Sequence, residues 1–233
     1  MNTNQVREDF DGIADLEGGG DGWNHNRHYH AFILEQLPAT IEHAMEIGCG
    51  SGELARAIAT RTGRVLAVDL SSRMIARARA HVPESTNIQY LVHDVSDWIW
   101  PIEQFNAIIS VATFHHLPLP QILANCAQAL LPGGRLIVLD LFRPQTFADF
   151  AACAIAFPIN RIMQRWSRPS RQLQQAFASH GQNDQYMSLS EVHNTAIEAG
   201  LRHSRIRRHL FFRYSLTWVK PIRAPARNSE ISN

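Results

Sequence analysis

Short apolar segments that favour β-strands alternate with helical segments from residue 44 onward, and this alternation restricts the possible folds more than any other feature. The predicted strands span residues 43–47, 64–70, 87–94, 105–112 and 135–142. Several of them are almost continuously apolar, which is typical of parallel strands covered by helices on both faces. The sequence therefore predicts an α/β fold with a doubly wound, mostly parallel sheet and short right-handed connections.

Helical patterns fill the gaps between these strands, at residues 51–60, 71–82, 119–134 and 188–200. We expect Pro132-Gly133-Gly134 to end the third of these helices, and a polar cap to open the fourth. Two β-prone segments follow, at 203–208 and 210–220.

The chain is predicted to be a single domain, residues 1–233, with five parts. The parts are a flexible N-terminal cap with a glycine hinge at 1–23, a ligand-binding core at 24–142, a helical insertion at 143–187, a helix and strand pair at 188–220, and a disordered tail at 221–233. The insertion forms either a substrate lid or helices that pad the edge of the sheet.

The stretch AMEIGCGSGELARA, residues 44–57, follows the first strand and contains Gly48, Gly50 and Gly52. A dinucleotide-binding turn requires glycine at the next position, where this chain has Glu53. Glu46 precedes the turn, and a carboxylate repels a pyrophosphate but attracts a cation, by about 4 kcal/mol at about 4 Å and an effective dielectric of about 20. The turn therefore favours a cationic ligand.

Two further carboxylates end neighbouring strands. Asp69 closes the second strand, where it can accept hydrogen bonds from a ribose diol. Asp94 closes the third strand, where an adenine amino group can be recognised, although Asp97 lies close by. A cationic nucleoside satisfies all these features together.

Five motifs in order and at matching spacing make the chain resemble a class I S-adenosylmethionine-dependent methyltransferase, from about residue 24 to 220. They are MEIGCGSG, VLAVDLSSRMI, YLVHDVSDW, FNAIISVATFHHLP and LLPGGRLIVLDLF. The resemblance implies a Rossmann-like sheet of seven strands with an antiparallel last strand, and S-adenosylmethionine as cofactor. It places the glycine turn at the methionyl end of the cofactor. The implied cofactor-binding residues are Glu46, Gly48, Cys49, Gly50, Gly52, Asp69, Leu70, Met74, Asp94, Val95 and Val111.

Candidate residues for the acceptor side follow the fourth strand and precede the first. His115 and His116 are candidates for a general base, because imidazole titrates near neutral pH; alternatively, their loop only closes over the cofactor. Trp23, His25 and Tyr29 either cover the methionyl end or belong to a helix that packs on the sheet.

No metal site is predicted from the sequence. His25, His28 and His30 do not share one helix face, and the chain has no H-E-x-x-H motif and no cysteine cluster.

A small organic acceptor is predicted mainly by exclusion. After the fourth strand the chain has SVATF in place of the Asn-Pro-Pro-Tyr type of motif found in amino-directed nucleic-acid and glutamine methyltransferases. Its single lysine, Lys220, excludes the Lys-Asp-Lys-Glu tetrad of some ribose methyltransferases. Residues 1–140 have nine arginines against sixteen acids, whereas residues 141–233 have thirteen basic residues against five acids. That basic part leaves two alternatives open: an arginine-rich lid that binds RNA or another polyanion, or a non-catalytic cofactor-binding regulator.

Other partners and the compartment are predicted from composition. We expect no nucleic-acid partner, no transmembrane segment and no secretory signal, with peripheral membrane contact left open, and a monomer or homodimer. Three scattered cysteines, Cys49, Cys126 and Cys153, favour reduced thiols in the cytoplasm.

Overall fold

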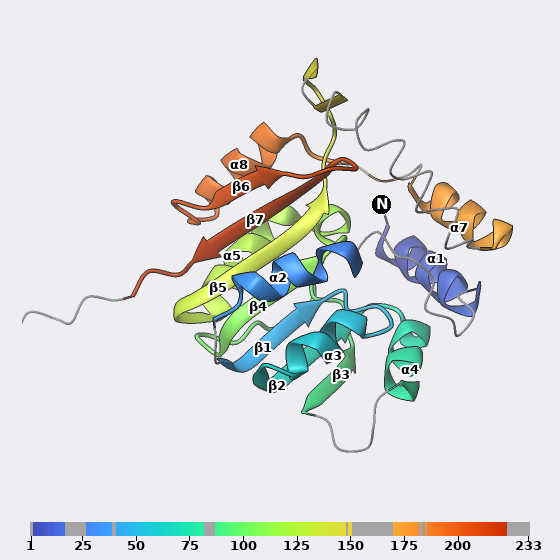
Figure 1. Cartoon of the computed structure of the whole chain (residues 1–233), viewed down its shortest axis with the longest axis horizontal. Coiled ribbons are helices and arrows are strands. Elements are labelled where there is room, and N and C mark those ends of the chain that lie inside the picture. The colour runs from blue at the N-terminus through green and yellow to red at the C-terminus, as the bar shows by residue number, and fades with distance from the viewer. Residues whose placement is uncertain are drawn as a thin grey trace, which may run out of the picture.

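A computed structural model describes residues 2–16, 27–38, 41–81, 87–147, 149–150, 170–181, 184 and 186–222. In these residues a seven-stranded sheet has the order β3-β2-β1-β4-β5-β7-β6 (Figure 1). The strands are β1 (Ile41–Ile47), β2 (Thr62–Asp69), β3 (Ile88–Val92), β4 (Phe105–Val111), β5 (Leu130–Leu141), β6 (Arg205–Arg208) and β7 (Arg213–Val219). β1 to β5 are parallel, and β7 runs antiparallel to β5 and β6. The predicted fold class and the antiparallel last strand are thus confirmed.

Helices cover both faces of the sheet. They are α1 (Thr3–Leu16), α2 (His30–Gln36), α3 (Glu53–Ala59), α4 (Ser72–Ala80), α5 (Leu119–Ala129), α7 (Arg171–Gly181) and α8 (Leu189–Glu198), with short 3-10 helices η1 (Arg27–Tyr29) and η2 (Phe114–His116). On one face Ile33 of α2 and Ile58 of α3 are fully buried, and on the other Ile122 of α5 and Ala196 of α8 are fully buried. Burial on both faces explains why the central strands, such as β4, are almost continuously apolar.

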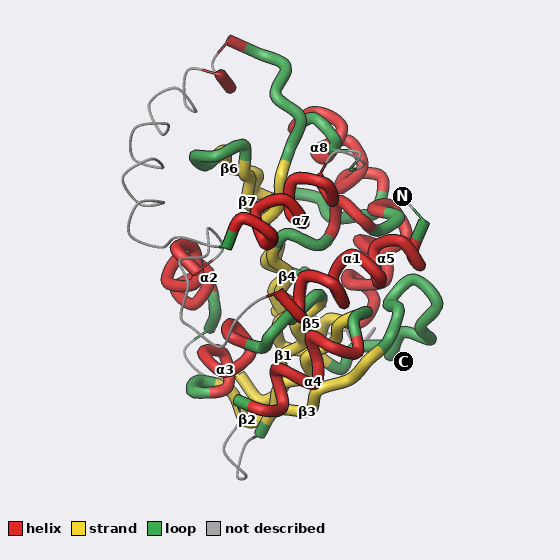
Figure 2. Tube along the Cα trace, turned by 90° about the vertical axis from the view of Figure 1, so that its right-hand side faces the viewer, coloured by secondary structure: helices red, strands yellow, loops and turns green. Residues whose placement is uncertain are grey.

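The chain reverses its order along the sheet between β1 and β4, which are hydrogen-bonded neighbours. Ligands of open α/β sheets bind outside the carboxyl ends of the strands at such a reversal. Here α1 and α7 lie beyond those ends, in front of the strands in Figure 2. Ile13 and Ala14 of α1 form a small apolar cluster with Met74 of α4, and Leu173 of α7 packs against it.

One predicted boundary is wrong. The helix predicted for 119–134 ends at Ala129, and Leu130 already begins β5. Gly133, with a φ of 80°, donates its amide to the carbonyl of Lys220, and the amide of Lys220 donates to Gly134. These hydrogen bonds with the residue that follows β7 therefore extend β5 toward its N-terminal end, through the Pro-Gly-Gly sequence. No helix of the described residues is long and apolar enough to cross a membrane.

Candidate active site

The turn between β1 and α3 is built on three glycines. Gly48, Gly50 and Gly52 have φ angles of 73°, 50° and 75°, a region that other residues enter at a cost. The amides of Gly48 and Cys49 donate to the carbonyl of Val68 at 2.8 and 3.0 Å. These bonds hold the turn against the end of β2.

The three glycines serve different purposes. A Cβ atom at Gly48 would overlap the side chain of Thr113, and one at Gly52 would overlap the ring of Tyr90. A Cβ atom at Gly50 would meet nothing within 4 Å. Gly48 and Gly52 thus permit close packing, whereas Gly50 leaves bare backbone facing open space.

Asp69 ends β2 directly behind this turn. Its Oδ2 accepts a hydrogen bond from the amide of Gly50 at 2.7 Å, and its Oδ1 accepts one from the amide of Ser71 at 2.8 Å. Burial raises the pKa of Asp69, and these amide hydrogen bonds offset part of the rise. A carboxylate offers about four lone-pair sites, so Asp69 keeps the capacity to accept a further hydrogen bond.

Glu46 lies beneath the turn and is 2% exposed. Its Oε2 has no hydrogen-bond partner among the described residues. Burial, followed by the nearby charge of Asp69, holds the pKa of Glu46 well above its ordinary value. A cation placed near this carboxyl would favour its ionised form.

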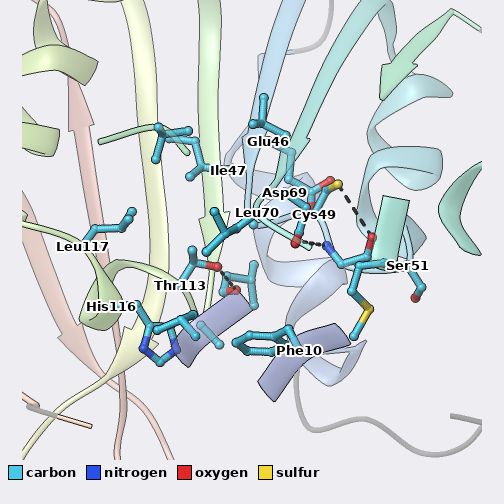
Figure 3. A pocket seen from close by; sticks show the side chains of 18 of the residues that line it. Phe10, Glu46, Ile47, Cys49, Ser51, Asp69, Leu70, Thr113, His116 and Leu117 are labelled. Atoms are coloured by element: carbon cyan, nitrogen blue, oxygen red, sulfur yellow. Dashed lines mark hydrogen bonds between the residues drawn. The ribbon is translucent and has the colours of Figure 1, made fainter. Parts of the chain in front are cut away.

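A cavity opens over the glycine turn, and we call it the glycine-turn cavity (Figure 3). The loops after β1, β2, β3 and β4 form its floor, and Thr3, Val6 and Phe10 of α1 form part of its wall. The predicted cofactor residues on its wall are Glu46, Gly48, Cys49, Gly50, Asp69, Leu70, Met74, Asp94, Val95 and Val111. Gly52 is not among them. Contact of these residues with a cofactor stays a prediction.

Of the three predicted cap residues, the structure describes only Tyr29. Trp23 and His25 lie outside the described residues. Tyr29 is buried away from the cavity, where its hydroxyl donates to the carbonyl of Leu210 at 3.2 Å and its ring contacts His209 edge-on. His30, its neighbour in sequence, lines the cavity instead, and burial lowers the pKa of its imidazole.

His115 is held by the carboxylate of Asp140, the last residue but one of β5. The backbone amide of His115 donates to Asp140 Oδ2 at 2.9 Å, and its Nδ1 lies 2.6 Å from Asp140 Oδ1. Burial works to lower the pKa of His115, but the carboxylates of Asp140 and Asp184 outweigh it and raise that pKa. Both side chains of the His115–Asp140 pair are almost completely enclosed.

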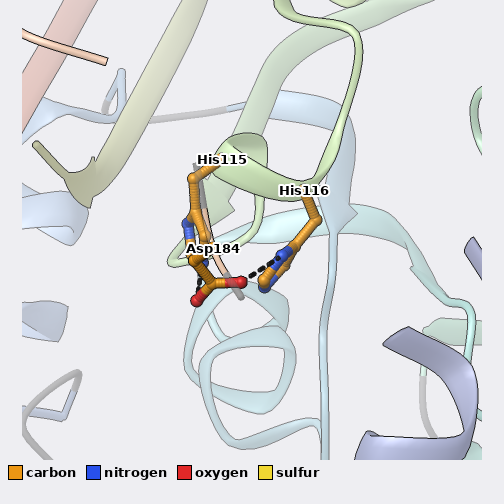
Figure 4. Close-up of side chains that lie close together, drawn as sticks. All are labelled: His115, His116 and Asp184. Atoms are coloured by element: carbon orange, nitrogen blue, oxygen red, sulfur yellow. Dashed lines mark ion pairs between the residues drawn. The ribbon is translucent and has the colours of Figure 1, made fainter. Parts of the chain in front are cut away.

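Asp184 lies between the two neighbouring imidazoles (Figure 4). Its Oδ2 is 3.6 Å from His115 Nε2, and its Oδ1 is 3.3 Å from His116 Nδ1. The hydroxyl of Tyr186 donates to Oδ2 at 2.7 Å. Burial works to raise the pKa of Asp184, but the contacts with His116 and Tyr186 lower it to about 2. Asp184 is therefore ionised at neutral pH.

His116 connects this group to α1 and α7. Its Nε2 is 3.2 Å from Nε2 of His180, whose Nδ1 is 2.9 Å from Oδ2 of Asp9. The ring of Phe10 packs edge-on against both imidazoles. Burial is the main cause that lowers the pKa of His116. Unlike His115, His116 also lines the glycine-turn cavity.

The sequence singled out His115 and His116 but missed the groups around them. Asp140 had a usable signal, because it ends a predicted parallel strand at the edge where ligands bind. Asp9, His180 and Asp184 had none, since they match no motif and meet the histidines only through tertiary contacts.

The known proteins that this chain resembles are methyltransferases. Residues 44–134 match the family described as "Methyltransferase domain". The chain is 27% identical over 213 residues to an uncharacterized methyltransferase of Mycobacterium tuberculosis, and the match covers 86% of this chain and 98% of that protein.

Two solved structures of similar fold are complexes, one with an activator protein and one with small molecules. The methyltransferase bound to the Haloferax volcanii Trm112 methyltransferase activator has a TM-score of 0.63 and 18% identity, over 91% of this chain and 97% of that chain. Phosphoethanolamine N-methyltransferase 2 of Haemonchus contortus, in complex with phosphomonomethylethanolamine and S-adenosylhomocysteine, has a TM-score of 0.56 and 20% identity, over 77% of this chain and 38% of that chain.

Proposed function

The chain belongs to the class I S-adenosylmethionine-dependent methyltransferases, and we propose that it transfers the methyl group of S-adenosylmethionine to a small organic acceptor. When bound, the cofactor supplies a methyl carbon that its sulfonium activates toward displacement. The residues of this chain then have to hold the cofactor, align the acceptor and remove a proton from the acceptor where the reaction requires it.

The observation that carries the cofactor assignment is the buried Glu46 carboxyl, whose Oε2 has no hydrogen-bond partner in the described part of the chain. A buried acid with a raised pKa and a free oxygen disfavours a pyrophosphate and favours a cationic ligand. The bare backbone at Gly50 allows that ligand to approach closely. We assign Glu46 and the glycine turn to the methionyl end, Asp69 to the ribose and Asp94 to the adenine.

Methyl transfer is an in-line displacement, and holding the two reactants in line is worth about 7–11 kcal/mol. On the acceptor side we assign His116, because it lines the cavity, whereas His115 is turned toward Asp140. If the acceptor loses a proton, an imidazole in this position contributes about 10²–10⁴ in rate as a general base.

The walls of the glycine-turn cavity support a small acceptor. α1 and α7 both contribute to it, through Phe10 and Phe177, so the opening lies under helices rather than on a flat face. The Haemonchus contortus enzyme of similar fold holds a small phosphorylated amine. We propose that α1 and α7 act as the lid of this site.

The polyanion alternative depends on the arginines of residues 143–187. Of these, Arg143 already contacts Glu191 at 3.0 Å, and residues 151–169 lie outside the described part of the chain. Binding of RNA would weaken steeply with salt, because each neutralised phosphate releases counterions. A non-catalytic regulator would bind the cofactor but never turn it over.

Two measurements test the proposal. Calorimetry of S-adenosylmethionine and S-adenosylhomocysteine with the full chain tests the cofactor, and we expect both to bind with one site per chain. Incubation with methyl-labelled cofactor and a panel of small amines, phenols and carboxylic acids, beside total RNA, then tests the acceptor. Absence of cofactor binding would overturn the proposal, and labelling of RNA alone would replace it with the polyanion alternative.

We further propose a cytoplasmic protein that is a monomer or homodimer. Cys49 and Cys126 are buried free thiols, as expected in a reducing compartment. Mass photometry of the purified chain tests the oligomeric state.

A further inference from the structure

Hydrogen bonds determine which nitrogen carries the proton in two of the buried histidines. His115 Nδ1 faces Asp140 at 2.6 Å, and His180 Nδ1 faces Asp9 at 2.9 Å. An ionised carboxylate only accepts hydrogen bonds, so each Nδ1 must be the donor. In the neutral imidazole, Nε2 of His115 and of His180 therefore carries a lone pair.

The tautomer of His116 follows from that of His180. The two Nε2 atoms are 3.2 Å apart, and because His180 presents a lone pair, His116 must donate from Nε2. The Nδ1 atom of neutral His116 is then left with a lone pair. This atom is buried and has no hydrogen-bond partner among the described residues.

In their neutral forms, the two imidazoles thus turn lone pairs toward one carboxylate. His115 Nε2 is 3.6 Å from Asp184 Oδ2, and His116 Nδ1 is 3.3 Å from Asp184 Oδ1. Asp184 Oδ1 is also buried, and no described residue forms a hydrogen bond with it. Both separations exceed the usual range of about 2.7–3.2 Å for an N–H···O bond, so protons alone would bridge them poorly. Leaving such buried groups unpaired is costly.

We propose that a divalent metal ion of the zinc type binds between His115, His116 and Asp184 (Figure 4). One ligand atom from each residue lies within 4.8 Å of the others. Metal–ligand bonds of about 2.0–2.2 Å place ligand atoms up to about 4 Å apart, so shifts below about 1 Å close the site. Two imidazoles and a carboxylate, with a fourth position open, are the ligands of catalytic zinc.

The surroundings of the three ligands support this assignment. Asp140 holds the ring of His115 through Nδ1, and Tyr186 holds Asp184 through its hydroxyl. Carboxylates and hydroxyls that orient the ligands in this way are typical of metal sites. The sequence predicted no metal from His25, His28 and His30, and the proposed site uses different residues that only the fold brings together.

The role of the ion, unlike its binding, rests on the proposed function. His116 lines the glycine-turn cavity, whereas His115 and Asp184 do not, so the ion is linked to the cavity through His116. A divalent ion lowers the pKa of a hydroxyl bound to it, and this favours an acceptor with a hydroxyl group. His116 then acts as a ligand, and its Nδ1 no longer serves as a base.

Zinc binding to the full chain tests the site without cofactor or acceptor. Protein stripped with a chelator is titrated with ZnCl₂ in competition with a chromogenic chelator, and bound zinc is counted by elemental mass spectrometry. We expect one tight zinc per chain, and at least about 100-fold weaker binding in Asp184→Asn and in His115→Gln. His193→Gln, which removes an exposed histidine of α8, is the matched control and should bind zinc like the wild type.

Circular dichroism and S-adenosylmethionine binding of each variant show whether it folds. Cobalt(II) in place of zinc adds a visible spectrum that reports ligation, which a purely structural role of Asp184 would not change. Equal zinc affinity in wild type and Asp184→Asn, or no tight site in the wild type, overturns the proposal. A chain that binds zinc but not S-adenosylmethionine would instead contradict the proposed function, so the two failures are distinguishable.

Discussion

The backbone amide of Gly50 donates a hydrogen bond to Asp69 Oδ2 at 2.7 Å, and this bond joins the glycine turn to the end of β2. The amide of Ser71 donates to the other oxygen of the same carboxylate. Asp69 therefore fixes the shape of the turn before any ligand arrives, and the residue lines the glycine-turn cavity.

Asp69→Ala is expected to weaken S-adenosylmethionine binding by at least about tenfold, because it removes both the proposed ribose acceptor and the support of the turn. Calorimetry at fixed pH and salt measures this loss. The matched control is Asp97→Ala, which removes an exposed acid on the loop after β3 and should bind the cofactor like the wild type. Unchanged affinity in Asp69→Ala would remove the ribose assignment.

Gly48→Ala is expected to lower mainly the stability of the protein, and Gly50→Ala mainly its affinity for the cofactor. Both substitutions place alanine at a positive φ, at a cost of about 1–2 kcal/mol. At Gly48 the new methyl group also overlaps Thr113, so the midpoint of urea unfolding should fall further than for Gly50→Ala. At Gly50 the methyl group enters open space, so the main loss should be cofactor affinity. Equal unfolding midpoints for the two variants would contradict this division of roles.

Binding of S-adenosylmethionine is expected to release protons. In the free protein, burial raises the pKa of Glu46, so the folded chain holds a proton that an exposed glutamate would already have lost. A cation nearby favours the ionised form, and the affinity should therefore rise with pH, from the ordinary range of glutamate up to the raised pKa. Calorimetry in buffers of different ionisation enthalpy counts the protons.

Glu46→Gln is the control for this pH dependence, because glutamine has the same shape and does not titrate. It should remove most of the proton release. S-adenosylhomocysteine, which lacks the sulfonium, should release fewer protons than S-adenosylmethionine from the wild type. Equal proton release in wild type and Glu46→Gln would show that another group titrates.

The core of the sheet was predictable because its signals are local. The central strands β1, β4 and β5 consist mostly of buried residues, and Gly48 and Asp69 stand at strand ends where motif and topology agree. The start of β5 was not predictable, because Pro132-Gly133-Gly134 is also a helix stop signal, and only pairing with Lys220 shows that it belongs to a strand.

The helix α1 had no such signal. It buries only Val6, Ile13 and Ala14, and its partners α4 and α7 are distant in sequence. The group around His116 depends on this helix, because Asp9 and Phe10 reach it only after α1 has docked. A sequence can therefore supply the two histidines but not their partners.

Phe10→Ala is expected to weaken cofactor binding about fivefold, because Phe10 lines the glycine-turn cavity and packs edge-on against His116 and His180. An edge-on aromatic contact is worth about 0.5–1.5 kcal/mol. The exposed Phe147→Ala is the control for general loss of an aromatic side chain. If Phe10→Ala and Phe147→Ala bind the cofactor equally well, α1 is not part of the site.

Ser188→Ala is expected to destabilise the protein by about 1 kcal/mol, because Ser188 opens α8 with a capping box. Its hydroxyl accepts from the amide of Glu191, whose carboxylate in turn accepts from the amide of Ser188. The pKa of Glu191 is lowered by these bonds, so its contribution is present at neutral pH and is lost as pH falls through that pKa. Urea unfolding at neutral and acidic pH measures both effects, with the exposed Asn194→Ala of the same helix as control. Equal stability of Ser188→Ala and Asn194→Ala at neutral pH would contradict the capping role of Ser188.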